Sequence, residues 1–193
     1  EETRSGMNSC LLAVLAPAEL LWKAAAGQKL HFGGTVLNMR LGRGLRVAEV
    51  GVLAADGNVG FLNDGLKVGL WGGTDFTGDY KEFDYYLSYS VAGFSVALWD
   101  IYNYSPELPF SKDIFNYNKF STSHFLDLSV GYNFDTLFEV PLRLNWATIF
   151  AGRDLNDAGN NRYSTFVYAE YSVFRDEHWI VDLGLDATLS FAH

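Results

Sequence analysis

The sequence predicts an all-β protein, an antiparallel up-and-down transmembrane β-barrel of about 8–12 strands. Apolar and polar residues alternate along the C-terminal two-thirds of the chain, and this period of two is typical of β-strands. Aromatic residues make up 16% of the 193 residues, and 19 glycines accompany only 4 prolines, a composition that suits strands and tight turns. No apolar run reaches the ~18 residues of a membrane-crossing helix.

The chain divides into an N-terminal segment, residues 1–27, and a predicted barrel domain, residues 28–193. Residues 11–18 are apolar and end in Ala16-Pro17-Ala18, which is similar to a signal-peptide cleavage site. The preceding residues carry a single basic side chain, which is poor for a signal peptide. The segment is therefore interpreted as a signal remnant, a short helix or a plug at the barrel mouth.

The first strands are the weakest, because their glycines dilute the alternation. The candidates are residues 28–41, 46–61 and 65–75. In the last of these, Lys67 points away from the face that carries Leu66 and Val68. The Asp-Gly at the end of residues 62–65 predicts a tight turn between the second and third candidates.

The later strands alternate clearly. The predicted ranges are 82–91, 94–104, 124–134, 142–150, 164–173 and 178–191. Asp100 breaks the pattern of its strand, which predicts a bulge or an early exit from the apolar zone. Both faces of 164–173 carry aromatic residues, and Glu170 decides which face is polar. About nine strands result. Bacterial barrels have even numbers, so we expect either strands missing at the C-terminus or one false strand among the first three.

The predicted links differ in length at the two ends of the strands. The links at one end are short, at 62–65, 92–93 and 175–178, and a moderately short link on the same side covers 135–140. The links at the other end are longer, at 75–80, 105–119 and 154–161. Outer-membrane barrels have short periplasmic turns and longer extracellular loops, so this asymmetry favours a place in the bacterial outer membrane.

Two sets of side chains follow from the alternation. Aromatic side chains near the short-turn ends would form a girdle at the lipid interface: Tyr89, Phe94, Tyr132, Phe134, Tyr171 and Trp179. In a sandwich, the same rings would be core residues. Charged side chains on the other face would point into the lumen: Lys67, Glu82, Asp84, Asp127, Arg143, Glu170, Asp182 and Asp186. They form either a salt-bridged polar core or a narrow acid-lined path for cations.

Three stretches carry a family likeness: Gly42-Arg43-Gly44-Leu45, residues 125–132 and residues 163–171. With them, the chain from about residue 28 resembles the TorF-type porins, in a Bacteroidetes-like version. That family usually has an aromatic residue before the Arg-Gly, where this chain has Leu41 and Gly42. The resemblance implies outer-membrane placement and a pore role, and it does not cover residues 1–27.

The sequence points away from several other functions. A net charge of -9 argues against nucleic-acid binding. Cys10 is the only cysteine, which excludes an intrachain disulfide and a multi-cysteine metal site. The four histidines lack the spacing of a metal site, and no G-x-S-x-G occurs. We expect no enzyme activity, cofactor or metal, although a Ser-His-Asp arrangement on the outer wall stays open.

Three functions remain. The first is a porin-like passive channel for small solutes or cations. The second is a non-catalytic accessory or structural subunit of a larger outer-membrane complex, whose partners are outer-membrane lipid and other outer-membrane proteins. The third is a soluble ligand-binding β-barrel.

Overall fold

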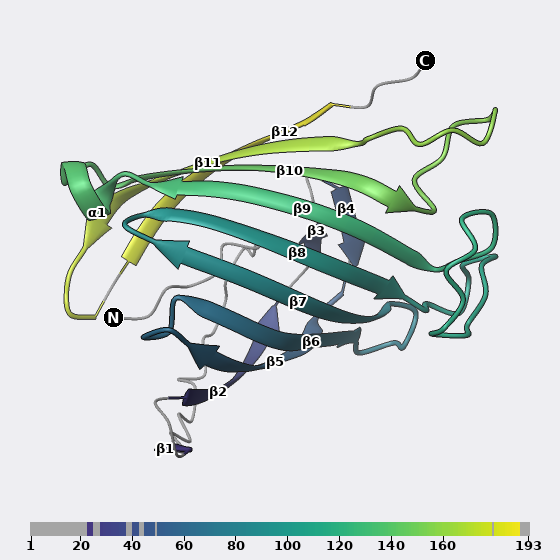
Figure 1. Ribbon diagram of the computed structural model, residues 1–193, viewed down its shortest axis with the longest axis horizontal. Coiled ribbons are helices and arrows are strands. Elements are labelled where there is room, and N and C mark those ends of the chain that lie inside the picture. The colour runs from purple at the N-terminus through teal and green to yellow at the C-terminus, as the bar shows by residue number, and fades with distance from the viewer. Residues whose placement is uncertain are drawn as a thin grey trace.

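The computed structural model describes residues 23–24, 28–37, 40–42, 45–48, 50–178 and 180–189. Within these ranges the chain forms a ten-stranded antiparallel sheet and a separate two-stranded sheet (Figure 1). Neighbouring strands of the large sheet follow one another along the chain. The one interruption among the described residues is the small two-stranded sheet, which lies in the sequence between the second and third strands of the large sheet. The prediction of an all-β, antiparallel up-and-down fold is confirmed.

From residue 65 onward the strands agree closely with the sequence pattern, whereas the predicted strands 28–41 and 46–61 are each divided in two. The large sheet contains β1 (Lys23–Ala24), β2 (Gln28–Leu37), β5 (Val52–Phe61), β6 (Leu66–Asp75), β7 (Lys81–Val91), β8 (Phe94–Asn103), β9 (His124–Asn133), β10 (Leu142–Gly152), β11 (Thr165–Arg175) and β12 (Ile180–Leu189). The small sheet contains β3 (Arg40–Gly42) and β4 (Leu45–Ala48). A short helix, α1 (Asp135–Phe138), lies between β9 and β10.

The N-terminal boundary differs slightly from the prediction. β1 lies inside the segment 1–27 that was set apart from the barrel, and it pairs with the beginning of β2. The other residues of that segment, and the signal, helix and plug interpretations placed on them, lie outside the described residues. The sheet is curved (Figure 1), and among the described residues no pairing joins β12 to β1 or β2.

Asp100 was expected to mark either a bulge or an early exit from the apolar zone. The bulge is wrong, because β8 pairs regularly through Asp100, opposite Tyr85 on one side and Leu126 on the other. The register shifts lie elsewhere, between Ile149 and Ala151 and between Ser172 and Phe174. Asp100 shares the outward side of β8 with Leu98, and its carboxylate meets the link that follows the strand.

The links have the expected asymmetry. We call one end of the sheet the turn end, where links 62–65, 92–93, 134–141 and 176–179 lie, and the other the loop end, where links 38–51, 76–80, 104–123 and 153–164 lie. Leu62, Asn63 and Asp64 have φ of 52°, 56° and 72°, so this turn is tight and left-handed, as its sequence predicts.

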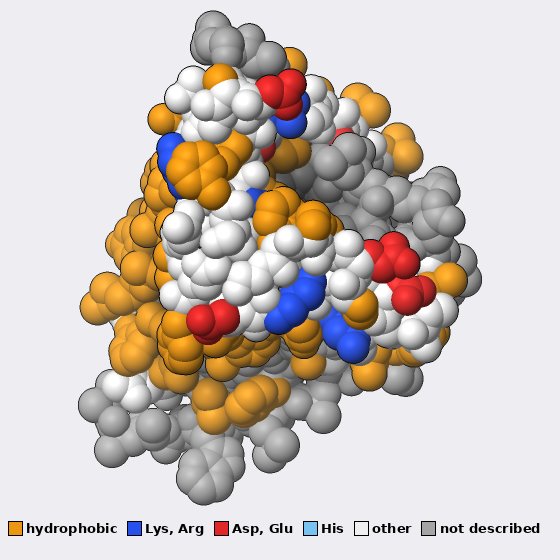
Figure 2. All heavy atoms as spheres, turned by 90° about the vertical axis from the view of Figure 1, so that its right-hand side faces the viewer, with side chains coloured by type: hydrophobic (Ala, Val, Ile, Leu, Met, Phe, Trp, Pro, Cys, Tyr) orange, Lys and Arg blue, Asp and Glu red, His pale blue; other side chains and the backbone are white. Residues whose placement is uncertain are grey.

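The two faces of the sheet have opposite polarity, and the polar face is the buried one. Asp84 and Asp127 are 1% and 0% exposed on the inner face, whereas Leu87 and Leu98 are 44% and 45% exposed on the outer face. Figure 2, viewed from the loop end, shows hydrophobic side chains gathered along the flank of the molecule. A water-soluble sheet buries its apolar face instead. Among the described residues, no helix is long and apolar enough to cross a membrane.

Candidate functional site

The eight side chains predicted to face the lumen all lie on the inner face, but they do not form one cluster. Glu82 and Asp84 lie toward the loop end of β7. Arg143, Glu170 and Asp182 lie toward the turn end, on three adjacent strands. Asp127 and Asp186 lie between these groups, and Lys67 lies beside the turn that joins β5 to β6. The charged side chains are therefore spread along the inner face from the loop end to the turn end.

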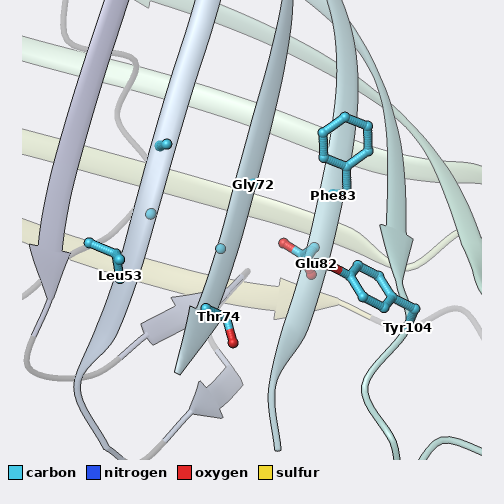
Figure 3. Close-up of a pocket in the computed structure, with 9 residues that line it drawn as sticks. Leu53, Gly72, Thr74, Glu82, Phe83 and Tyr104 are labelled. Atoms are coloured by element: carbon cyan, nitrogen blue, oxygen red, sulfur yellow. The ribbon is translucent and has the colours of Figure 1, made fainter. Parts of the chain in front are cut away.

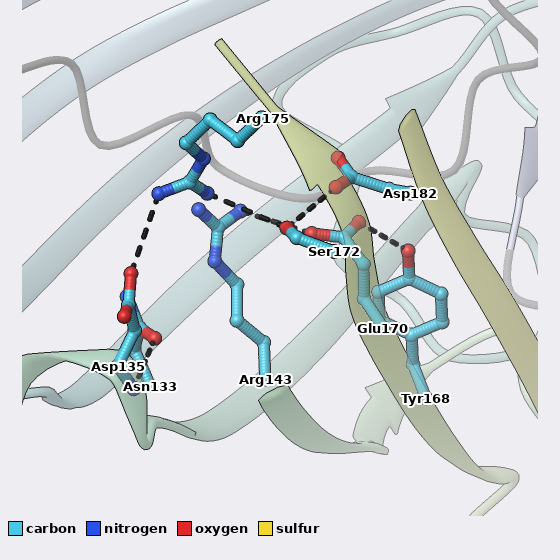
Figure 4. A network of polar contacts seen from close by, with 8 residues as sticks. All are labelled: Asn133, Asp135, Arg143, Tyr168, Glu170, Ser172, Arg175 and Asp182. Carbon is cyan, nitrogen blue, oxygen red and sulfur yellow. Dashed lines mark hydrogen bonds and ion pairs between the residues drawn. The ribbon is translucent and has the colours of Figure 1, made fainter. Parts of the chain in front are cut away.

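A network of both charge signs occupies the turn end (Figure 4). Arg143 Nη1 lies 3.0 Å from Glu170 Oε1, on directly paired positions of β10 and β11. The Tyr168 hydroxyl donates to the other Glu170 oxygen at 2.6 Å. Because the Glu170 side chain is only 13% exposed, the arginine and the phenol replace water around the carboxylate. Glu170 thus orients β11 as the sequence pattern indicates.

The same network continues to the edge strand. The Ser172 hydroxyl donates to Asp182 Oδ1 at 2.6 Å, and Arg175 Nη2 donates to Ser172 at 3.4 Å. Arg175 also reaches Asp135 of α1, with 3.3 Å between nitrogen and oxygen. These contacts connect β11, β12 and the helix at one end of the inner face (Figure 4).

Lys67 and a residue missed by the sequence interpretation meet at the tight turn. Asp64 Oδ2 lies 3.6 Å from Lys67 Nζ, and Asp64 Oδ1 lies 3.1 Å from His31 Nε2. The turn carboxylate therefore lies between the His31 ring of β2 and the Lys67 ammonium of β6. The Asp-Gly pair predicted the turn but gave no sign of this contact.

Large rings fill the middle of the inner face. Tyr86 stacks on Trp99 with 4.4 Å between ring centroids, and its hydroxyl donates to Asp56 at 2.9 Å. Asn58 donates to the same carboxylate at 3.2 Å. Gly69 makes this possible, because a Cβ there would lie 2.3 Å from the Tyr86 ring. Asp56 lies in a glycine-rich stretch, where weak alternation hid it from the sequence interpretation.

Replacing Gly69 with valine tests that packing. The new side chain must displace the Tyr86 ring from Trp99 and from Asp56, so we expect a loss of about 1–3 kcal/mol in the free energy of unfolding. Gly72→Val is the control, because a Cβ at Gly72 meets its nearest side-chain atom at 3.6 Å. Urea titration in lipid vesicles measures both variants. Equal losses would show that the Gly69–Tyr86 fit does not matter.

Arg153 lies at the loop end, and the sequence interpretation did not predict a role for it. Its guanidinium lies 4.3 Å from the ring centroid of Phe125 and 4.9 Å from that of Phe110. Burial lowers the pKa of Arg153 to about 10, while the nearby Glu82 carboxylate acts in the opposite direction. The guanidinium therefore stays charged at neutral pH. Glu82 also accepts a hydrogen bond from Asn103 at 3.4 Å.

His124 forms a cluster on the outward side of the same rim. Its Nδ1 lies 2.6 Å from Asp100 Oδ1, and its Nε2 lies 2.9 Å from the carbonyl oxygen of Ile114. The carbonyl can only accept, so Nε2 donates to it. Both ring nitrogens are engaged, so this histidine and aspartate do not form a Ser-His-Asp arrangement. Tyr117 donates to Asp100 Oδ2 at 2.6 Å.

The predicted girdle residues lie on the outward side near the turn end, as far as they are described. Tyr89, Phe94 and Tyr171 are 39%, 42% and 46% exposed. The rings of Tyr132 and Phe134 meet edge to face, with 4.8 Å between centroids. Trp179 lies outside the described residues.

No family model, curated protein or solved structure matches the chain. The likeness to TorF-type porins therefore stays an expectation from the sequence. Among the described residues, no group of three or more His, Cys, Asp or Glu side chains could hold a metal ion.

A shallow groove of about 290 Å³ lies at the loop end of β5, β6 and β7 (Figure 3). Its lining includes Leu53, Thr74, Phe83 and Tyr104 around the small residue Gly72. Glu82 is the single charged side chain of this lining. The groove suits hydrocarbon better than a charged solute.

Proposed function

We propose that this protein is a bacterial outer-membrane β-barrel that acts as a narrow, porin-like passive channel for small solutes or cations. The observation that carries the proposal is the reversed polarity of the sheet, with apolar side chains exposed on the outer face and charged side chains on the inner face, where Glu82, Asp84 and Asp127 are buried. In lipid this arrangement is favourable, since the outer side chains meet hydrocarbon and the inner ones meet each other or water. In water it would expose the larger part of the apolar surface.

The sign of the inner charges supports a preference for cations. The described acids of the inner face are Asp56, Asp75, Glu82, Asp84, Asp127, Glu170, Asp182 and Asp186. The bases on or beside this face are fewer, namely Lys29, Lys67, Arg143, Arg153 and Arg175. Acidic linings attract cations in channels, so an open path along this face would favour cations.

Conductance across a planar bilayer tests the channel. We expect small, voltage-independent current steps in potassium chloride and a reversal potential that favours potassium over chloride. Several purified preparations that insert into the bilayer without current steps would contradict the proposal. The heat-modifiable gel mobility of folded barrels verifies that each preparation is folded.

Removing one inner base should change the selectivity. Arg143→Gln deletes a positive charge beside Glu170, so we expect the permeability ratio of potassium to chloride to rise about twofold, as one charge across a few water layers predicts. Arg162→Gln is the matched control, since Arg162 is exposed in the β10–β11 link. A ratio that changes equally in both variants would place the path away from Arg143.

Exposed aromatic side chains at the loop end favour the second candidate, an accessory subunit of an outer-membrane complex. Phe115 and Phe120 are 85% and 66% exposed in the β8–β9 link. Surface aromatic residues of this kind are enriched where proteins bind partners. Extraction in mild detergent distinguishes the two, because an accessory subunit purifies with a partner at fixed stoichiometry and an independent channel purifies alone.

A further inference from the structure

We propose that residues 104–123, the link between β8 and β9, form a lid over the loop end of the inner face, held shut by a latch on the outward side of the rim. The latch consists of His124, Asp100 and Tyr117. This inference rests on the proposed function, because the lid would control entry to the same inner face. Its structural part can be tested without any measurement of transport.

The inner contact of the lid is a stack of three side chains. The Arg153 guanidinium lies 4.9 Å from the ring centroid of Phe110 in the lid and 4.3 Å from that of Phe125 in β9. Phe125 pairs with Ile101, which is 4% exposed on the inner face. Phe110 thereby joins the lid to the inner face and helps bury the charge of Arg153.

The outer contact is the latch. By strand alternation Tyr102 and His124 point outward, yet they are 5% and 0% exposed because the lid covers them. The His124 ring lies between the rings of Tyr102 and Tyr117, with centroid distances of 4.7 Å and 4.3 Å. Burial and the hydrogen bond to Asp100 raise the pKa of Tyr117, so its hydroxyl stays a donor.

The hydrogen bonds of the latch connect the lid to two strands. The Ile114 carbonyl accepts from His124 of β9 at 2.9 Å, and the Tyr117 hydroxyl donates to Asp100 of β8 at 2.6 Å. The Tyr102 hydroxyl donates to the Lys112 carbonyl at 2.6 Å. Because the side chains of His124 and Asp100 are 0% and 17% exposed, removal of either leaves a little-exposed polar group without its hydrogen-bond partner.

The lid is braced internally, so it can move as a unit. Ser111 N donates to the Ser121 carbonyl at 2.9 Å, and Asn116 donates to the Ser121 hydroxyl at 3.1 Å. Asp113 and Asn118 accept backbone hydrogen bonds two residues ahead, each at 3.0 Å. Beyond the stack and the latch, an exposed bond of 3.0 Å from Lys119 to the Gly159 carbonyl joins the lid to the next link. At the beginning of the lid, Tyr104 N donates to the Lys81 carbonyl at 2.9 Å, and the Ser105 hydroxyl accepts from Lys81 N at 2.9 Å, so these two residues anchor it to β7. A few localised contacts over a braced segment are typical of regions that open locally.

Cysteine labelling tests the lid. In a Cys10→Ser background, Ile101→Cys places the reporter thiol on the inner face beside Phe125, and a membrane-impermeant maleimide measures its accessibility in proteoliposomes. We expect slow labelling with the latch intact and at least about tenfold faster labelling after Asp100→Ala. Asp157→Ala, in the next link and exposed, is the matched control and should leave the rate unchanged.

A milder variant keeps the test decisive if Asp100→Ala does not fold. Tyr117→Phe removes one hydroxyl from a residue that is 53% exposed. It should also accelerate labelling of the reporter thiol, by a smaller factor than Asp100→Ala. Unchanged labelling in a folded latch variant would overturn the lid, and so would fast labelling of the parent. Faster labelling without any conductance would keep the lid and contradict the channel.

Discussion

Replacing Leu98 with arginine is expected to lower the free energy of unfolding in a lipid bilayer by about 2–4 kcal/mol, as for a cation at the middle of a barrel strand. Leu98 lies in the middle of β8, is 45% exposed, and pairs with Leu87 and Leu128 on the outer face. If that face meets hydrocarbon, the guanidinium must be taken out of water. Urea titration of protein folded into vesicles measures the loss.

The control for Leu98 is the same substitution at Leu62, which is 71% exposed in the tight turn. A residue at the membrane–water boundary should lose only about 0–1 kcal/mol on the same change. The comparison also separates the membrane barrel from the soluble β-barrel. In water, an arginine on the exposed outer face changes stability by no more than about 0.5 kcal/mol, and that result for Leu98 would exclude a membrane-spanning sheet.

Gly152→Ala is expected to lower the free energy of unfolding by about 2–4 kcal/mol, from backbone strain and steric overlap together. Gly152 has φ of 101°, a conformation that residues with a Cβ rarely adopt. An added Cβ would lie 2.2 Å from the carbonyl oxygen of His124, which also accepts from Arg153 N at 3.0 Å. The substitution therefore disturbs the backbone beneath both the latch and the Arg153 stack.

Gly33→Ala is the control for Gly152. A Cβ at Gly33 would meet no heavy atom within 4 Å, so we expect a change within about 0.5 kcal/mol. Urea titration in vesicles again gives the difference. If Gly152→Ala had the same small effect, the backbone at the end of β10 would have to be more adaptable than its φ indicates.

Much of the fold could be predicted because strand alternation is a local property. In β12, Leu183 and Leu185 alternate with Asp182 and Asp186, and this pattern alone indicates a strand with one polar face. The same pattern placed all eight charged candidates on one face. The alternation is weaker in the glycine-rich strands β2, β5 and β6, since a glycine belongs to neither class.

The missed residues share a physical reason. Arg153 follows the end of β10, where alternation stops, so the pattern could not assign it to a face. Asp100 was noticed as a break in the pattern, but its partner His124 is 24 residues away and meets it across two strands. Such contacts depend on register and on the path of the links, and alternation contains neither.

The sequence by itself determined the strands from residue 65 onward, their order and the polarity of each face, because these follow from residue period and turn chemistry along a short stretch of chain. Only the tertiary structure decided which charges meet. It paired Arg143 with Glu170 through the register of β10 and β11, and it brought Asp100, His124 and Tyr117 together through the folding back of one link. A charge on a strand can be assigned to a face by counting, whereas its partner is set by the neighbouring backbone.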